Sequence, residues 1–579
     1  MAGCATKSTP PPRVASNADA PSVSGVQSAS TSGLFGYVAG NHAWAQDDTK
    51  QAADFYLAAY LDDPGNVTIE RRTFQLLLAD SRFDEAVAFS RLIVEGRAIH
   101  GPAQMVLALD ALKRRRYRAA ERILGKTKGT GFEALIRPLA MAWIYAGRGN
   151  QKDALAVLQR LKEGLAFKRY ALEHEALTLD RLGDTEAADR AYTLLWDESG
   201  SGTVRSSLAY ISFLARHGRQ AEAMMRLHLL DQLVPGHSTV RQFGETLRAG
   251  GIPQPLVDTP AQGVAEALYR TAADLSEDRV SASAVTYSRL ATLVAPDFAE
   301  AHLLLAGLME RTEQLDAALL SLERIQETDP LFERAALSRA LILDRLSRGQ
   351  EARVLLDKLI DQNNDNLRFK KSLADLLRRQ ERYADARQLY DELIELSVKD
   401  GETALEQGET NRKKWTELDI GQLYYLRGVC LERLDDWEAA EADLENARRL
   451  RPESAIILNY LGYSWLDRGM NVDEATALIE KASELRPGDG FITDSLGWAF
   501  FKQGRFEEAV RVMAEAAAIE PTDPTIAEHY GDALWRVGRH IEARFQWRHA
   551  VSLKPDEERL AGLLDKVDYG LLIATTAMP

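Results

Sequence analysis

Residues 496–521 read LGWAFFKQGRFEEAVRVMAEAAAIEP, and residues 530–555 read YGDALWRVGRHIEARFQWRHAVSLKP. The second stretch repeats the first at a distance of 34 residues, since Gly531 follows Gly497 and Ala543 follows Ala509. Each stretch ends on a proline, which cannot continue a helix because it lacks a backbone N–H. Each stretch therefore predicts a pair of helices, and a period of this length predicts an array of such pairs.

The same register extends from about residue 33 to residue 554. Only small side chains fit where the two helices of a pair approach most closely. On the second helix this column is alanine in every repeat: Ala52, Ala86, Ala120, Ala154, Ala188, Ala223, Ala284, Ala318, Ala352, Ala386, Ala440, Ala475, Ala509 and Ala543. On the first helix it is mostly small: Gly40, Phe74, Ala108, Ala142, Ala176, Ile211, Ala272, Ala306, Ala340, Ala374, Gly428, Gly462, Gly497 and Gly531.

This pattern resembles the tetratricopeptide repeat. Positions 8, 15, 20, 24, 27 and 32 of that repeat are matched by Gly531, Gly538, Ala543, Trp547, Ala550 and Pro555. The resemblance implies an all-α fold, a right-handed superhelical solenoid of about fourteen helix pairs. After the last pair, apolar residues at helical spacing predict a capping helix that covers the final repeat.

Two longer steps in the register divide the array. The first contains Gly250, Gly251 and two prolines, a cluster that breaks regular structure, and the second is rich in charge. We therefore expect a start and polar tether (1–32), an N-terminal half (33–235), an irregular or hinge insertion (236–265), middle repeats (266–396), a charged insertion (397–416), C-terminal repeats (417–555) and a capping helix with tail (556–579).

The composition excludes several functions. The chain carries 71 basic and 86 acidic residues, a net charge of −15, whereas binding to nucleic acid phosphates needs a basic surface. Lys126 and Thr127 resemble the end of a phosphate-binding loop, but Ala120 stands where its first glycine belongs. The ten histidines show no metal-ligand spacing on one helix. We predict a protein that is not an enzyme, with no cofactor, metal or nucleic acid.

The first residues carry a separate signal. Ala2, Gly3 and Cys4 precede a stretch rich in serine, threonine and proline, and they resemble the end of a bacterial lipobox. The resemblance implies that Cys4 carries a lipid and that the polar stretch is a flexible tether to the periplasmic face of the outer membrane. A cytoplasmic protein with an ordinary polar tail stays open as the alternative.

In tetratricopeptide arrays the first helix of each pair lines the concave groove. Positions 2, 5, 9 and 12 of the last four repeats form an aromatic row with polar neighbours. Aromatic side chains are enriched where proteins bind one another. The candidate partner-binding residues are Tyr425, Asn459, Tyr463, Phe491, Asp494, Trp498, Phe501, Glu528, Asp532 and Trp535. The alternative is that several of these rings pack between neighbouring repeats.

The lipobox-like start, the tether and the array together resemble outer-membrane lipoproteins built of tetratricopeptide repeats. The segments 494–498 (DSLGW) and 531–535 (GDALW) are similar to the subgroup of adaptors for carboxy-terminal processing proteases. That resemblance implies a scaffold that holds a protease together with its substrates, such as cell-wall hydrolases. A structural lipoprotein of an envelope export or assembly complex and a cytosolic scaffold are the alternatives. The sequence does not indicate an oligomeric state.

Overall fold

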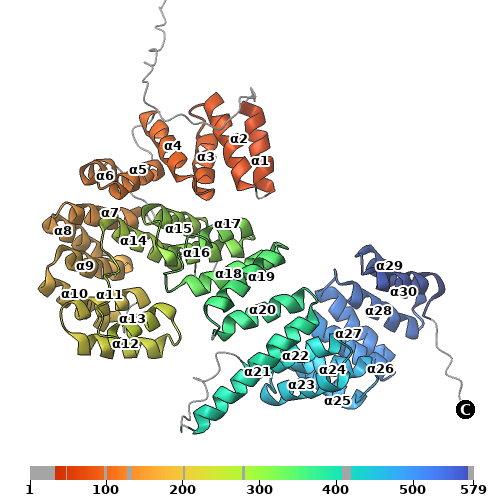
Figure 1. Ribbon diagram of the computed structural model, residues 1–579. Coiled ribbons are helices and arrows are strands. Elements are labelled where there is room, and N and C mark those ends of the chain that lie inside the picture. The colour runs from red at the N-terminus through yellow and green to blue at the C-terminus, as the bar shows by residue number, and fades with distance from the viewer. Residues whose placement is uncertain are drawn as a thin grey trace, which may run out of the picture. The chain divides into compact units, whose positions relative to one another are not determined.

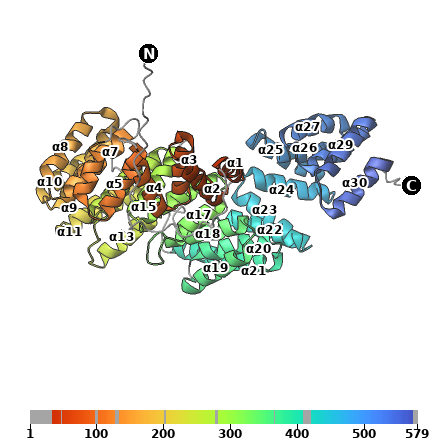
Figure 2. The same cartoon turned by 90° about the horizontal axis from the view of Figure 1, so that it is seen from above.

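The chain folds into helices throughout the part that the structure describes. The computed structural model describes residues 33–46, 48–96, 101–126, 133–199, 203–276, 281–364, 366–406 and 419–571. These residues form thirty α-helices and one short 3-10 helix, with no strand among them. The helices follow one another as antiparallel pairs (Figures 1 and 2). The prediction of an all-α solenoid of fourteen helix pairs with a final capping helix is confirmed.

Contacts divide the chain into two compact units, Met1–Phe332 and Glu333–Pro579. The helices of unit 1 are α1 (Gly33–Ala45), α2 (Thr49–Asp62), α3 (Val67–Ala79), α4 (Phe83–Gly96), α5 (Gly101–Lys113), α6 (Tyr117–Leu124), α7 (Glu133–Gly147), α8 (Gln151–Lys162), η1 (Leu165–Phe167), α9 (Lys168–Leu182), α10 (Thr185–Ser199), α11 (Val204–Arg216), α12 (Gln220–Leu233), α13 (Ser238–Arg248), α14 (Pro260–Asp274), α15 (Ala282–Val294), α16 (Ala299–Arg311) and α17 (Leu315–Leu322).

Unit 2 begins in the first turn of α18. Its helices are α18 (Phe332–Arg345), α19 (Gly349–Gln362), α20 (Leu367–Arg379), α21 (Tyr383–Glu406), α22 (Ile420–Arg433), α23 (Trp437–Leu450), α24 (Ala455–Asp467), α25 (Val472–Leu485), α26 (Gly490–Lys502), α27 (Phe506–Ile519), α28 (Pro524–Arg536), α29 (His540–Ser552) and α30 (Glu557–Tyr569).

The alanine column explains how each pair closes. All fourteen alanines on the second helices are 0% exposed. Opposite them, a Cβ on Gly531 would come within 2.5 Å of the Trp547 ring. Small residues in these two columns let each pair of helices pack in close contact.

The turn inside each pair is equally regular. Position 15 of the repeat has a positive φ in twelve repeats, at Ser81, Arg115, Gly149, Gly183, Gly218, Glu313, Ser347, Glu381, Asp435, Gly469, Gly504 and Gly538. A left-handed residue ends the first helix there.

In unit 1, helices α14 and α15 pack against the first helices of earlier repeats, which line the inner face of the array. Helix α14 contacts the first helices α5, α7 and α9, and α15 contacts α3 and α5; Figure 1 shows α14 beside α7. The groove positions of α7 are consequently buried, with Leu139 and Trp143 at 0% exposure. Trp143 Nε1 donates to His174 Nδ1 at 3.0 Å, and burial lowers the pKa of His174 to about 3. The inner face of these repeats is filled by the protein itself.

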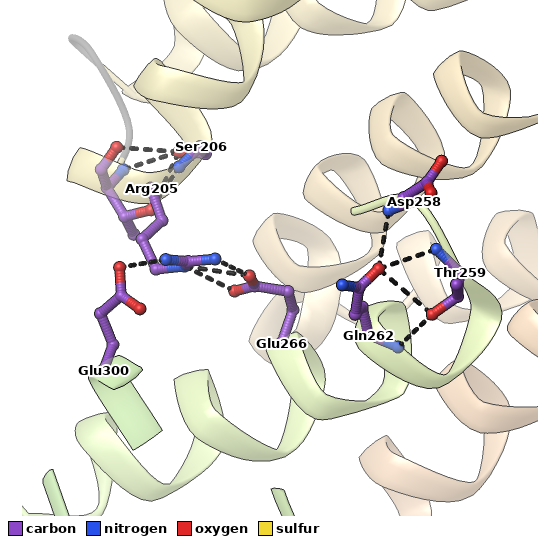
Figure 3. A network of polar contacts seen from close by, with 8 residues as sticks. Arg205, Ser206, Asp258, Thr259, Gln262, Glu266 and Glu300 are labelled. Carbon is purple, nitrogen blue, oxygen red and sulfur yellow. Dashed lines mark hydrogen bonds and ion pairs between the residues drawn. The ribbon is translucent and has the colours of Figure 1, made fainter. Parts of the chain in front are cut away.

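A half-buried arginine joins the repeats on either side of the predicted insertion. Figure 3 shows Arg205, on α11, between Glu266 of α14 and Glu300 of α16. Arg205 Nε donates to Glu266 Oε2 at 3.0 Å and Arg205 Nη2 donates to Glu266 Oε1, the fork geometry that arginine favours. The same view shows the capping box that starts α14, where Thr259 Oγ1 accepts from Gln262 N at 3.2 Å.

The two segments predicted to interrupt the repeats differ in structure. Residues 236–265 contain the unpaired helix α13 and an irregular stretch, and Ser212 Oγ lies 3.0 Å from both Pro253 O and Gln254 O. In the charged segment 397–416, helix α21 continues to Glu406, and residues 407–418 lie outside the described residues. Among the helices described, none is long and apolar enough to cross a membrane.

Candidate functional site

The ten predicted groove residues lie on the first helices of the last four repeats. Helices α24 and α26 are in contact, as are α26 and α28, so equivalent positions form one row. Helix α22 carries Tyr425; α24 carries Asn459 and Tyr463; α26 carries Phe491, Asp494, Trp498 and Phe501; α28 carries Glu528, Asp532 and Trp535.

Trp498 stands at the centre of this row. Its ring stacks on Phe501, with centroids 4.8 Å apart, and on His529, with centroids 4.2 Å apart. His529 Nδ1 donates to Asp494 Oδ2 at 2.8 Å, and both side chains are 7% exposed. Burial by itself would lower the pKa of His529, but the charge and hydrogen bond of Asp494 outweigh it and raise the pKa. The hydrogen bond to Asp494 thereby fixes the orientation of the His529 ring on which Trp498 stacks.

Three buried polar atoms on α24 and α26 have no hydrogen-bond partner among the described residues. They are Asn459 Oδ1, Asp494 Oδ1 and Trp498 Nε1. An unsatisfied buried polar group costs about 1–3 kcal/mol, and folded proteins leave few of them. Two acceptors and one donor match the N–H and C=O groups of an extended peptide main chain. These unsatisfied atoms single out α24 and α26 as the candidate site.

Comparison with known proteins identifies the repeats of this region. The model of the tetratricopeptide repeat family matches residues 337–400, 413–490 and 495–548. This part of the chain is a tetratricopeptide-repeat array. None of the curated proteins matches the sequence.

Solved structures with tetratricopeptide repeats are similar at low identity. A repeat protein from Parabacteroides merdae is 17% identical, over 46% of this chain and 98% of its own, with a TM-score of 0.36. The Cut9–Hcn1 complex is 13% identical, over 92% and 96% of the chains, with a TM-score of 0.37. Yeast Tom70 is 12% identical, over 93% and 95%, with a TM-score of 0.30.

The last tetratricopeptide repeat is covered by the capping helix α30. Lys566 Nζ lies 2.7 Å from both Glu528 Oε1 and Asp532 Oδ2. The backbone of Gly570 packs so closely on Trp535 that a Cβ there would come within 2.1 Å of the ring. The three predicted groove residues of α28 are thus bound within the protein, and the open part of the row lies on α24 and α26.

The remaining predicted residues differ in exposure. Phe491 is 55% exposed at the start of α26. Tyr463 is half-buried, and burial with the nearby carboxylates raises its pKa to about 12. Tyr425 packs edge-on against Tyr460 of the next repeat, with centroids 5.5 Å apart. Cys4 lies outside the described residues.

Two residues that hold this site were absent from the sequence prediction. His529 and Lys566 fall at positions where the repeat pattern assigns no groove contact, so only the three-dimensional packing brings them to Asp494 and Asp532. The second cysteine, Cys430, is buried, and burial raises its thiol pKa to about 11. No cluster of side chains able to hold a metal ion occurs within the described residues.

Proposed function

We propose that this protein is a scaffold that binds an extended segment of a partner protein along α24 and α26 of unit 2. The observation that carries the proposal is the set of partnerless buried atoms, Asn459 Oδ1, Asp494 Oδ1 and Trp498 Nε1. A bound main chain that displaced the side chains covering these atoms would complete their hydrogen bonds. An apolar side chain of the partner would pack on exposed Phe491, which lies about two helical turns before Trp498 on α26. Aromatic anchors of this kind dominate binding energy.

We further propose that this scaffold is an adaptor that a lipid anchor holds at a membrane. The lipobox-like start supports a lipid on Cys4, and the polar segment up to residue 32 supports a flexible tether in the periplasm. Similarity to adaptor lipoproteins supports a carboxy-terminal processing protease and its cell-wall hydrolase substrates as partners. Such an adaptor works by raising the effective concentration of substrate near protease, so it needs no chemistry of its own.

Matched variants of the full-length protein test the groove. Trp498→Phe removes the indole N–H but keeps a ring, and Phe491→Ser removes an exposed ring. Phe545, on the outer helix α29, is 68% exposed, so Phe545→Ser is the matched control. In crosslinked pull-downs from the native envelope, we expect Trp498→Phe and Phe491→Ser to lose the protease while Phe545→Ser retains it.

The possible outcomes separate the binding site from the choice of partner. Equal recovery of the protease by all variants would refute binding of the protease along α24 and α26. Recovery of export or assembly subunits in place of the protease, still dependent on Trp498, would keep the groove and replace the adaptor role with a structural one. Unchanged hydrolase levels after deletion of the gene would refute the adaptor role directly.

A further inference from the structure

A cavity of about 840 Å³ is lined entirely by residues of unit 1. Its walls come from the turn between α3 and α4, the end of α5, and helices α15 to α17. The cavity exists because α15 packs back against α3 and α5. Its volume falls within the range of small-molecule sites in proteins, roughly 300–1,000 Å³.

Arg289 of α15 lines this cavity and is only 3% exposed. Its Nη1 donates to Ser81 Oγ at 3.0 Å, and its Nη2 contacts Met309 Sδ at 3.2 Å. Its Nε is buried and has no partner among the described residues, nor does any carboxylate there form an ion pair with the guanidinium. A guanidinium has five donor hydrogens, so most of its binding capacity is unused.

Burial of an unpaired cation is costly, because the charge loses its water without gaining a counter-charge. Burial lowers the pKa of Arg289 to about 10, against the weaker opposing effect of Asp80. The Asp80 carboxyl is itself half-buried, and burial raises its pKa. A residue that served only the fold would be paired or replaced by an apolar side chain, whereas groups left unsatisfied are typical of binding sites.

The rest of the wall indicates what kind of anion fits. Val87, Leu293, Leu305 and Met309 supply an apolar surface. Four acidic side chains, Asp80, Asp84, Asp110 and Asp297, also line the cavity, and so do the basic side chains Lys113, Arg114 and Arg324. With Arg289 the lining carries four carboxylates and four cations, so one negative charge on an apolar body suffices to neutralise the buried Arg289.

We propose that this cavity binds an organic monocarboxylate, with the carboxylate held by Arg289 and the apolar chain against Leu293, Leu305 and Met309. Because Nε is buried and Nη2 contacts Met309 Sδ, the carboxylate would displace the Met309 side chain and then accept the fork of hydrogen bonds in which arginine binds this group most strongly. The site is independent of the groove on α24 and α26, because it lies wholly within unit 1. Neither the repeat pattern nor the family match assigns it.

Calorimetric titration of the full-length protein with octanoate tests the site, with acetate, octanol and octylamine as comparison probes. We expect saturable binding of octanoate at one site, and binding weaker by roughly ten- to a hundredfold for the neutral and cationic probes. Arg289→Met should abolish octanoate binding. Because it removes a buried unpaired charge, it should leave the melting temperature unchanged or raise it. Arg190→Met is the control, since Arg190 on α10 is 72% exposed.

Other results would overturn the proposal. Octanoate binding that survives Arg289→Met, or that octanol matches, would show only non-specific apolar binding. If Arg289→Met fails to fold, Asp80→Asn replaces it, with tighter octanoate binding and an unchanged melting temperature expected. A lower melting temperature in Asp80→Asn would instead show that Asp80 and Arg289 form a structural pair.

Discussion

Gly263 on α14 lies against the indole of Trp143 on α7, and a Cβ on Gly263 would come within 2.1 Å of that ring. The two residues belong to the fourth and the seventh helix pairs of the array, and their contact places α14 inside unit 1. Trp143 has no room to move, since it is 0% exposed and hydrogen-bonded to His174.

We therefore expect Gly263→Ala to destabilise unit 1 by about 1–3 kcal/mol, the usual cost of overpacking a core. Calorimetric unfolding of the full-length protein measures it. Gly307 is the matched control, because it is also helical and a Cβ there would meet nothing within 4 Å. Gly307→Ala should stabilise the protein by roughly 0.5–1 kcal/mol. Equal effects of the two substitutions would contradict close packing at Gly263.

The capping helix gives a second prediction. Lys566→Met leaves the Asp532 carboxylate, which is 6% exposed, with the Trp547 indole as its remaining partner. We expect unfolding of the last repeat to become easier by about 2 kcal/mol, because a buried charge loses its counter-charge. Faster hydrogen exchange in α28 and α29 would show it. Asp565→Ala, a substitution at an exposed residue of the same helix, should leave the exchange rates unchanged. If Lys566→Met also left them unchanged, α30 would be held by apolar contacts and not by the ion pair.

The pair of Asp494 and His529 gives a pH dependence. Because the folded state raises the pKa of His529 above its ordinary value of 6.5, the folded state holds the proton more tightly than the unfolded chain. The stabilisation is complete below pH 6.5 and is lost as the pH rises through the raised pKa. Melting curves of wild type and His529→Gln across this range should converge as the pH rises. Parallel curves would indicate that His529 stays neutral.

Glu173 gives an effect of the same sign in unit 1. It is 8% exposed, and burial raises its pKa from 4.5 to about 7. The folded state therefore loses stability as the pH rises from 4.5 through 7, by roughly 3 kcal/mol at most. Glu173→Gln should melt higher than wild type at pH 8 and show little difference at pH 5. Glu186→Gln, at a side chain 92% exposed, should follow wild type at both.

The sequence predicted every helix pair, because each pair needs a small side chain where its two helices approach most closely. This requirement is local, so it appears in the sequence as a column of alanines. The sequence did not predict the return of α14 and α15, since the register contains no information about which distant surfaces meet. One signal was present: Leu139 and Trp143 occupy groove positions of α7, and apolar residues there need a cover. The groove residues of α26 were predictable by position, whereas Lys566 reaches Asp532 from a helix outside the register.

The packing of α14 against α7 in unit 1 has a consequence for how the gene can change. Repeat arrays ordinarily tolerate duplication or loss of a whole repeat, because each repeat contacts only its neighbours. Here the contact between Gly263 and Trp143 forms only with the present number of repeats between α7 and α14. Inserting or deleting one repeat between α7 and α14 would set Gly263 against a different side chain. The length of this half of the array is therefore part of its structure.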